Sequence, residues 1–254
     1  MLIYLDYKYW RNSGTMSEFW NEELSIGYYD KIVKEGFRNK KGIRSYWHIT
    51  TLNKVLEFIN INSSHLDYAC GPGTLIGLSL SNNSIGLDIS PRQIRYANDN
   101  YSNYGKFYTL DEIDFNNFSN KFDVVTLLGL IEFLKDDEIL DLMNVLDNVL
   151  KTNGKIIITT PNFRGKMLIL EKVQKYFGSI DYSKQHINRF NKERIISIFK
   201  PFSNYDFDYK AFLNISIIFS VMSHSFASRI EKMLATAFKD KLGSLFIVVL
   251  TKKS

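Results

Sequence analysis

The sequence predicts an α/β fold, in which strands and helices alternate within one domain. The first observation is the stretch 65–74, where an apolar run ends in an acid and a loop of small residues follows. The second is a short run that ends at Asp88 and is followed at once by signals for a helix start. The third is the segment 122–128, which is apolar almost throughout, as a buried parallel strand is.

The composition excludes several classes of protein. The 254 residues suffice for one large domain, and the single cysteine, Cys70, excludes a disulfide framework and is compatible with the cytoplasm. The net charge of +5 is too diffuse to indicate a nucleic-acid partner. The N-terminus lacks the pattern of a signal peptide, and Met16 is a second candidate start. We expect a cytoplasmic protein, and the sequence leaves its oligomeric state open.

The loop between Asp67 and Thr74 is typical of a nucleotide-binding turn. Its residues are small, so a ligand can come close to the backbone, and a helix start presents unpaired N–H groups to that ligand. Asp88 ends the next short strand, where an acid can bind the two hydroxyls of a ribose. These features predict a nucleotide-like cofactor. A glycine turn that binds no ligand is the alternative that we favour less.

A nicotinamide-binding domain is the rival interpretation. The glycines at 71, 73 and 77 fit a Gly-x-Gly-x-x-x-Gly spacing. The more diagnostic Gly-x-Gly-x-x-Gly spacing is absent, because Ile76 stands at its last position. No Tyr-x-x-x-Lys pair follows the loop, so short-chain reductase chemistry lacks its acid. No Gly-Lys-Ser/Thr follows either, which excludes a phosphate-binding P-loop.

Together these residues resemble the class I S-adenosylmethionine-dependent methyltransferases. Within that class they are similar to the methyltransferase domains of types 11 and 12 and to the quinone and small-molecule O-methyltransferases. The family's first motif is an acid followed by three glycines at alternate positions. Here the four positions are Asp67, Ala69, Gly71 and Gly73. An alanine replaces the first glycine, and Asp88 falls where the ribose-binding acid belongs. The resemblance runs roughly from residue 50 to residue 162.

The resemblance implies a Rossmann-like sheet of seven strands, mostly parallel, with helices on both faces and the last strand antiparallel. It also implies S-adenosylmethionine as the cofactor, with Ile89 and Leu128 among its contacts. Asp111 follows the predicted strand 106–109, where the family usually contacts the adenine, and it is the candidate for the exocyclic amine. An exposed loop acid is an equal alternative for Asp111.

The N-terminal residues 1–44 are predicted to form an extension and a helical cover. Within them, residues 17–34 are aromatic and acidic and favour one or two helices. Tyr29 or its neighbour Tyr28 is expected to face the substrate, and packing against the core is the alternative. The basic run 38–44 is expected either to be solvated surface or to attract an anionic substrate.

The domain proper is predicted to span residues 45–254. Residues 45–60 have apolar side chains at helical spacing, and residues 136–150 form an amphipathic helix with acids in its first turn. A further helix begins after Asp88 with a capping box and a proline at its first position. The residues concerned are Ser90, Pro91 and Gln93. Asn153 and Gly154 are predicted to turn the chain into a strand at 155–160.

The segment 129–134 is similar to the family's Gly-Val-Leu-Glu-His-Leu segment, with Phe133 in place of the histidine. Some quinone-biosynthesis relatives are thought to use acids and that histidine near a metal. Because Phe133 removes the likeliest ligand, we expect no metal site. Glu132 is expected to order the loop or to contact the substrate.

Beyond residue 162 the family signal weakens. A helix is predicted at 165–177, followed by a polar loop at 183–191. Many relatives carry His-x-x-x-Phe/Tyr here, so His186 is the candidate general base and Arg189 a substrate contact. An ordinary loop histidine is an equal alternative. The other histidines lie in apolar patterns and are expected to be structural: His48, His65 and His224.

The C-terminal part is predicted to hold a helix at 193–199 capped by Asn191, strands at 203–209 and 245–250, and a helical insertion around 211–240. The charge-free residues 211–227 are too short to span a bilayer. We expect a helical cover on the pocket, or a surface within 211–238 that contacts a membrane or a partner.

The predicted function is transfer of a methyl group from S-adenosylmethionine to a small-molecule, sugar or lipid-linked acceptor, with oxygen as the first choice. An alcohol loses a proton during transfer, so a histidine of ordinary pKa is a suitable base. N-methylation stays open, as does a non-catalytic protein that keeps the fold as a binding module.

Overall fold

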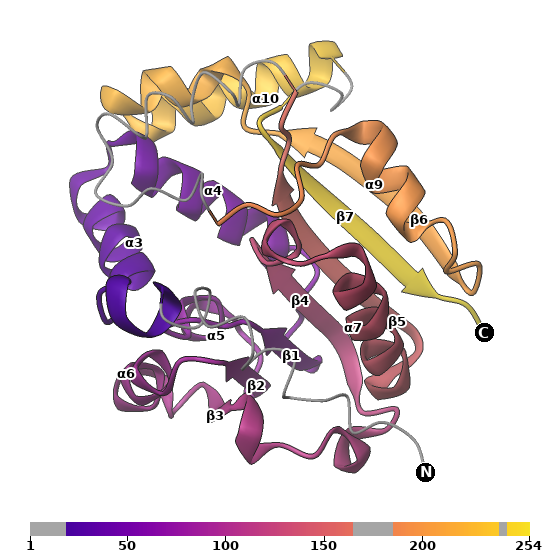
Figure 1. Cartoon of the computed structure of the whole chain (residues 1–254). Coiled ribbons are helices and arrows are strands. Elements are labelled where there is room, and N and C mark those ends of the chain that lie inside the picture. Colours follow the sequence, from indigo (N-terminus) through magenta and orange to yellow (C-terminus); the bar gives the residue numbers. More distant parts are fainter. Residues whose placement is uncertain (1–18, 165–184, 239–242) are drawn as a thin grey trace.

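The computed structural model describes residues 19–164, 185–238 and 243–254. Within them, seven strands form one sheet (Figure 1). The strands are β1 (Ser64–Tyr68), β2 (Asn83–Asp88), β3 (Gly105–Thr109), β4 (Phe122–Leu128), β5 (Leu150–Pro161), β6 (Tyr205–Phe212) and β7 (Leu245–Lys252). Their order is β3-β2-β1-β4-β5-β7-β6, and β7 runs antiparallel to both of its neighbours. The predicted fold class is therefore confirmed.

Helices of three kinds accompany the sheet. The α-helices are α3 (Tyr28–Asn39), α4 (Ile43–Leu56), α5 (Thr74–Leu78), α6 (Pro91–Tyr101), α7 (Asp136–Val149), α9 (Lys192–Phe199) and α10 (His224–Phe238). Short 3₁₀ helices are η2 (Leu110–Glu112), η3 (Phe115–Phe118), η4 (Ile131–Phe133) and η5 (Ile215–Val221), and η1 (Phe19–Glu23) is a π-helix. Among the described residues, none of these helices has the length and apolar character needed to cross a membrane.

The two faces of the sheet carry separate cores. On one face, α7 and α9 pack their apolar stripes on the strands. On the other face, α4 packs on the strands together with η5 and the start of α10 (Figure 1). The central strand β4 is apolar almost throughout because both of its faces are covered. Helices on both faces agree with the prediction.

The topology places a crevice at the carboxyl ends of the central strands. β1 pairs in parallel with β2 on one side and with β4 on the other. The chain leaves β1 toward β2 and β3 and then returns past β1 to β4, so the connections diverge at this point. In open α/β sheets, ligands bind where the strand order reverses in this way.

Local signals predicted several helix boundaries well. The Asn191 side chain accepts a hydrogen bond from the Arg194 N–H and caps α9 as expected. α7 begins at Asp136, and three acids occupy its first turn. The helix predicted at 165–177 lies outside the described residues.

The predicted capping box after Asp88 is wrong. The Ser90 side chain makes no capping hydrogen bond, although Ser90 holds the N-cap position of α6. Its partner Gln93 accepts instead from the N–H of Gly27 at 3.0 Å and donates to the carbonyl of Ser25 at 3.2 Å. Gln93 is therefore used to hold the N-terminal cover on the domain rather than to close the first turn of α6.

Two predicted boundaries in the sheet also need correction. No turn separates Asn153 from the next strand, because β5 runs without a break from Leu150. The extra residues form a bulge against β4, where Asn153 adopts a left-handed φ of 63°. In the C-terminal part, Ala211 and Phe212 end β6, and the helical segment begins only at Ile215.

Candidate active site

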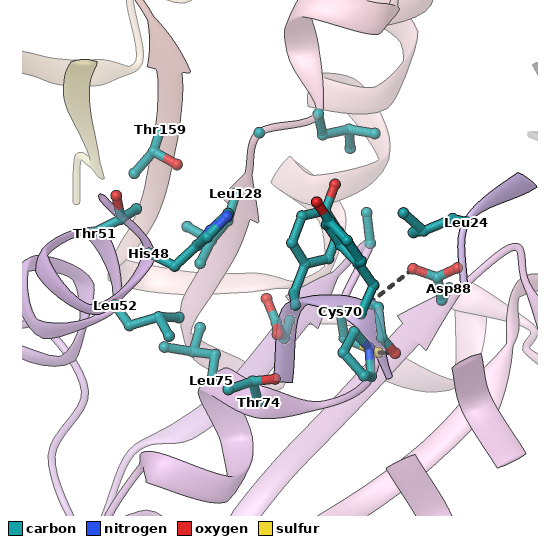
Figure 2. A pocket seen from close by; sticks show the side chains of 18 of the residues that line it. Leu24, His48, Thr51, Leu52, Cys70, Thr74, Leu75, Asp88, Leu128 and Thr159 are labelled. Atoms are coloured by element: carbon teal, nitrogen blue, oxygen red, sulfur yellow. Dashed lines mark hydrogen bonds between the residues drawn. The ribbon is translucent and has the colours of Figure 1, made fainter. Parts of the chain in front are cut away.

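A cavity of about 590 Å³ lies at the carboxyl ends of β1, β2, β4 and β5 (Figure 2). The loop after β1 forms its floor, and α3 and α4 contribute further side chains to its wall. Figure 2 shows two ends, with Asp88 at one and His48 and Thr159 at the other. The crevice that the topology predicts is therefore a real cavity with two different linings.

The loop after β1 explains the alternate glycines. The residues at 69, 71 and 73 all have left-handed backbone, with φ of 63°, 54° and 76°. Glycine adopts this conformation freely, whereas Ala69 does so at a cost of about 1–2 kcal/mol. A Cβ on Gly73 would come within 2.7 Å of Phe107, while a Cβ on Gly71 would meet nothing within 4 Å. Gly71 therefore lies open toward the cavity, and Gly73 is required for packing.

Asp88 is positioned by the backbone on both sides. One carboxylate oxygen accepts from the Gly71 N–H and the other from the Ser90 N–H, each at 2.8 Å. Burial raises the pKa of the Asp88 carboxyl, and these N–H groups partly offset the rise. The side chain lines the cavity with its orientation fixed before any ligand arrives. Such an acid suits recognition of vicinal hydroxyls.

An unsatisfied hydroxyl lies next to Asp88. Ser90 is one of the lining residues, and its buried Oγ has no hydrogen-bond partner among the described residues. Leaving a buried hydroxyl unpaired is costly, so the atom is suited to a ligand. The neighbouring side chains of Ile89 and Leu110 are apolar and also line this end. An acid, a free hydroxyl and an apolar wall fit a nucleoside.

Asp67, at the end of β1, is the second acid of the cavity. It accepts a hydrogen bond from Thr126 Oγ1 at 2.6 Å. Burial raises its pKa to about 7, and the nearby charge of Asp88 adds to the rise. His65 contacts the same threonine through Nε2 at 2.9 Å, and burial lowers its pKa to about 3. His65 is thus a neutral hydrogen-bonding group within the sheet.

The N-terminal cover is fastened by a buried acid. Asp30, on α3, accepts hydrogen bonds from Thr74 at the start of α5 and from Tyr96 on α6. These bonds hold α3 against α6 and against the start of α5, directly after the loop that follows β1. Tyr28 and Tyr29 precede Asp30 on α3, and both line the cavity.

Glu132 follows β4 and organises the far end of the cavity. Its carboxyl accepts from Thr160 Oγ1 at 3.0 Å, and burial raises its pKa to about 7. Its carbonyl oxygen accepts from the N–H groups of both Ile187 and Asn188 at 2.9 Å. The loop that carries His186 is therefore tied to the segment after β4.

His186 lies in the cavity wall between two phenylalanines. Its ring stacks on Phe133 at a centroid distance of 5.2 Å and meets the edge of Phe163 at 5.1 Å. It lines the same cavity as the loop after β1. Phe133 is buried, and its ring packs against that of His186.

His48 is a cavity residue that the sequence reasoning missed. It projects from α4 beside Thr51, and its ring lies 5.1 Å from that of Tyr29 (Figure 2). Burial, and to a smaller degree the charge of Arg44, lower the pKa of His48 to about 4. A signal was available, because Arg44, His48 and Thr51 are polar at spacings of four and three on a largely apolar helix.

The structure brings together most of the predicted site residues. Nine of them line the cavity: Tyr29, Asp67, Ala69, Gly71, Asp88, Ile89, Leu128, Glu132 and His186. Gly73 is in the loop itself and packs against Phe107, Asp111 is exposed on η2, and Arg189 is exposed beside Phe163 at 5.9 Å. None of these three lines the cavity, and the contacts assigned to Asp111 and Arg189 stay predictions.

No cluster of three or more His, Cys, Asp or Glu side chains that could hold a metal occurs in the described part of the chain. Independence of a metal stays a prediction.

The sheet order, with β7 antiparallel beside β5, defines a Rossmann-like fold with a cavity at the carboxyl ends of its central strands. A family model described as a methyltransferase domain matches residues 37–206. Because the match covers more than half of the chain, this protein belongs to that family, and it is an S-adenosylmethionine-dependent methyltransferase. None of the curated proteins matches the chain significantly.

Solved structures share the fold at low identity. An S-adenosylmethionine-dependent methyltransferase from Archaeoglobus fulgidus is 16% identical, with a TM-score of 0.54 over 80% of this chain and 92% of its own. Magnesium protoporphyrin IX methyltransferase from Synechocystis is 13% identical, with a TM-score of 0.59 over 95% and 100%. The plantazolicin methyltransferase BpumL is 18% identical, with a TM-score of 0.57 over 97% of each chain.

Proposed function

We propose that the protein transfers the methyl group of S-adenosylmethionine to an oxygen atom of a small-molecule acceptor. One observation carries the proposal: a single cavity joins the cradle at Gly71 and Asp88 to an end lined by His48, Glu132 and His186. The sulfonium of the cofactor already activates the methyl group. The residues of the cavity then have to align the acceptor and exclude water.

We assign the end of the cavity at Asp88 to the cofactor. We assign Asp88 to the ribose hydroxyls, because both of its oxygens are oriented by N–H groups and it lines the cavity. The free Oγ of Ser90 and the apolar Ile89 are assigned to the same nucleoside. Gly71 provides the close approach of backbone that a ligand needs here.

At the acceptor end we assign the base to His186 and hydrogen bonding to His48. A general base works best when its pKa lies near the working pH. The pKa of His48 is lowered to about 4, so its neutral ring accepts a hydrogen bond but removes a proton poorly. Glu132 holds the loop of His186 through its carbonyl and adds a buried carboxyl to this end.

The class of acceptor is inferred from the side chains that line the acceptor end of the cavity. The similar structures include a magnesium protoporphyrin IX methyltransferase and a plantazolicin methyltransferase, so this fold serves different acceptors. An amine acceptor needs no different scaffold. A small, sugar or lipid-linked acceptor with a hydroxyl is our first choice because two histidines and an acid line the acceptor end. We place the enzyme in the cytoplasm, which cell fractionation tests.

The test is a turnover screen with radiolabelled S-adenosylmethionine and a panel of phenols, alcohols, amines and cell extracts. The Asp88→Ala variant is the control, because at limiting S-adenosylmethionine its weaker cofactor binding should lower transfer to every acceptor. Labelled product with the methyl group on oxygen, found by mass spectrometry, supports the proposal. A product methylated on nitrogen, or cofactor binding without any transfer, contradicts it.

A further inference from the structure

η5 presents a row of apolar side chains to solvent. Ile215, Ile218 and Val221 are 49%, 57% and 55% exposed. They are spaced by three residues, and side chains at that spacing eclipse one another in a 3₁₀ helix, so they share one side. The opposite side of η5 is buried through Ser216, Ile217 and Ser220.

The row continues onto the start of α10. Met222 is 75% exposed and Phe226 is 42% exposed, and the Phe226 ring packs edge-on against Phe219 at 5.5 Å. We call the five exposed side chains the apolar face: Ile215, Ile218, Val221, Met222 and Phe226. Residues 211–227 contain no Lys, Arg, Asp or Glu. A large apolar patch on a protein surface marks an interaction site rather than solvated surface.

A basic segment is joined to the apolar face. The N–H of Gly42 donates to the carbonyl of Ser220 at 2.7 Å, and the N–H of His224 donates to the carbonyl of Lys40 at 2.8 Å. The run 38–44 therefore borders η5 and α10. It carries four cationic side chains and no acid. Three of them are exposed and form no ion pair with the described residues: Arg38, Lys40 and Lys41.

The same elements form a wall of the cavity. Ile217, on the buried side of η5, lines the acceptor end, and so do Ile43 and Arg44 of the basic run. Ile43 is also 41% exposed, so this residue of the cavity wall is accessible from solvent next to the apolar face. In Figure 1, α10 lies across the end of α4 on this side of the molecule. An acceptor that enters here passes the apolar face first.

We propose that the apolar face and the basic run bind an anionic lipid surface, and that the acceptor is a lipid-like molecule that enters the cavity from it. The proposal about the acceptor rests on the proposed function. Interfacial segments insert an apolar side into the boundary of the bilayer and place Lys and Arg at the anionic head groups. Both parts are present here on adjoining segments. A second copy of the chain fits less well, because a two-fold axis at this face would bring two basic runs together.

The probe is a set of vesicles, one of phosphatidylcholine alone and one of phosphatidylcholine with phosphatidylglycerol, used in co-sedimentation. The wild-type chain should bind the anionic vesicles, bind the neutral ones at least tenfold more weakly, and dissociate as salt rises. The double variant Ile218→Ser with Met222→Ser should lose tenfold or more of the binding, and so should Lys40→Glu with Lys41→Glu.

The matched control removes exposed apolar side chains elsewhere. Ile61 and Leu80 are 62% and 73% exposed and lie outside the apolar face. Ile61→Ser with Leu80→Ser should bind vesicles like the wild type. Calorimetry with S-adenosylmethionine should give the same affinity for all of these variants, which shows that they are folded.

Several outcomes would overturn the proposal that the apolar face and the basic run bind a lipid surface. One is a wild-type chain that stays in the supernatant with anionic vesicles at low salt. Another is a control variant that loses as much binding as the Ile218 and Met222 variant. A third is a dimer in light scattering that this variant converts to a monomer, which would make the face a contact between copies.

The acceptor is tested separately with radiolabelled S-adenosylmethionine and a total lipid extract of the source cells. We expect label in the lipid phase, and less of it with the double variant Ile218→Ser with Met222→Ser. If the chain binds vesicles but label is found only in water-soluble products, the acceptor is not lipid-like. The proposed methyl transfer itself is then unaffected. Vesicle binding with no transfer to any acceptor counts against the proposed function and removes the proposed acceptor with it.

Discussion

The carboxylate of Asp88 accepts a hydrogen bond from the N–H of Gly71 at 2.8 Å, so the end of β2 and the loop after β1 are fixed to one another. The two parts of the cofactor cradle thus form one unit. Charge-assisted hydrogen bonds to ribose hydroxyls contribute about 1.5–3 kcal/mol each. We expect Asp88→Ala to weaken S-adenosylmethionine binding at least tenfold in calorimetry.

The control for Asp88 is Asp99→Ala, which changes an exposed acid on the adjoining helix α6. Its cofactor affinity should equal that of the wild type. Circular dichroism confirms that both variants are folded. Unchanged affinity in a folded Asp88→Ala protein would mean that the ribose lies elsewhere.

Gly71 and Gly73 make a matched pair for the loop. Both have a left-handed φ, so alanine is strained at either position by about 1–2 kcal/mol. A Cβ at 73 also clashes with Phe107, whereas a Cβ at 71 points into open space. Gly73→Ala should therefore lower the free energy of unfolding more than Gly71→Ala does, as urea denaturation measures. Gly71→Ala should lose the larger share of cofactor affinity, and a reversed order would show that the loop is misassigned.

Substitution of the two cavity histidines should affect different kinetic constants. His186→Ala is expected to lower kcat by about 10²–10⁴-fold, as removal of a positioned base does, with little change in cofactor affinity. His48→Ala should mainly raise KM for the acceptor, because the low pKa of His48 suits hydrogen bonding. Steady-state kinetics with an acceptor that turns over provides the measurement. Normal turnover of His186→Ala would exclude this histidine as the base.

The stability of the cofactor-free protein should depend on the ionisation of Glu132. Burial raises the pKa of this carboxyl from 4.5 to about 7, so the folded state holds a proton that the unfolded state has lost. Its contribution is complete below pH 4.5 and is lost as pH rises through 7. The pKa of Asp67 is also raised to about 7, so its ionisation should lower the stability over the same pH range. Thermal unfolding between these values should show falling stability with rising pH, and a smaller fall in Glu132→Gln. An identical slope in the variant would argue against the raised pKa.

The fold was predictable where the signals are local. The motif from Asp67 to Gly73 names three positions that all turn out to have left-handed backbone. Asn191 caps α9 because its partner is only three residues away. The sheet order follows once the family resemblance is accepted, since buried parallel strands and short connections restrict the topology.

The errors and omissions arise where distant residues decide. Gln93 is diverted from the capping box by Gly27, a residue 66 positions earlier in the chain. His48 looked structural because its helix is largely apolar, and its place in the cavity depends on how α4 packs against the ends of β4 and β5. The bulge at Asn153 depends on the register with β4. Side-chain partners of this kind are set by tertiary packing, which periodicity and propensity do not encode.

The most direct test of the central claim is a calorimetric titration of the purified chain with S-adenosylmethionine, S-adenosylhomocysteine and NAD. The cradle at Gly71 and Asp88 predicts that both sulfur-containing nucleosides bind, and that NAD does not bind with comparable affinity. Tight binding of NAD with no response to S-adenosylmethionine would contradict the account.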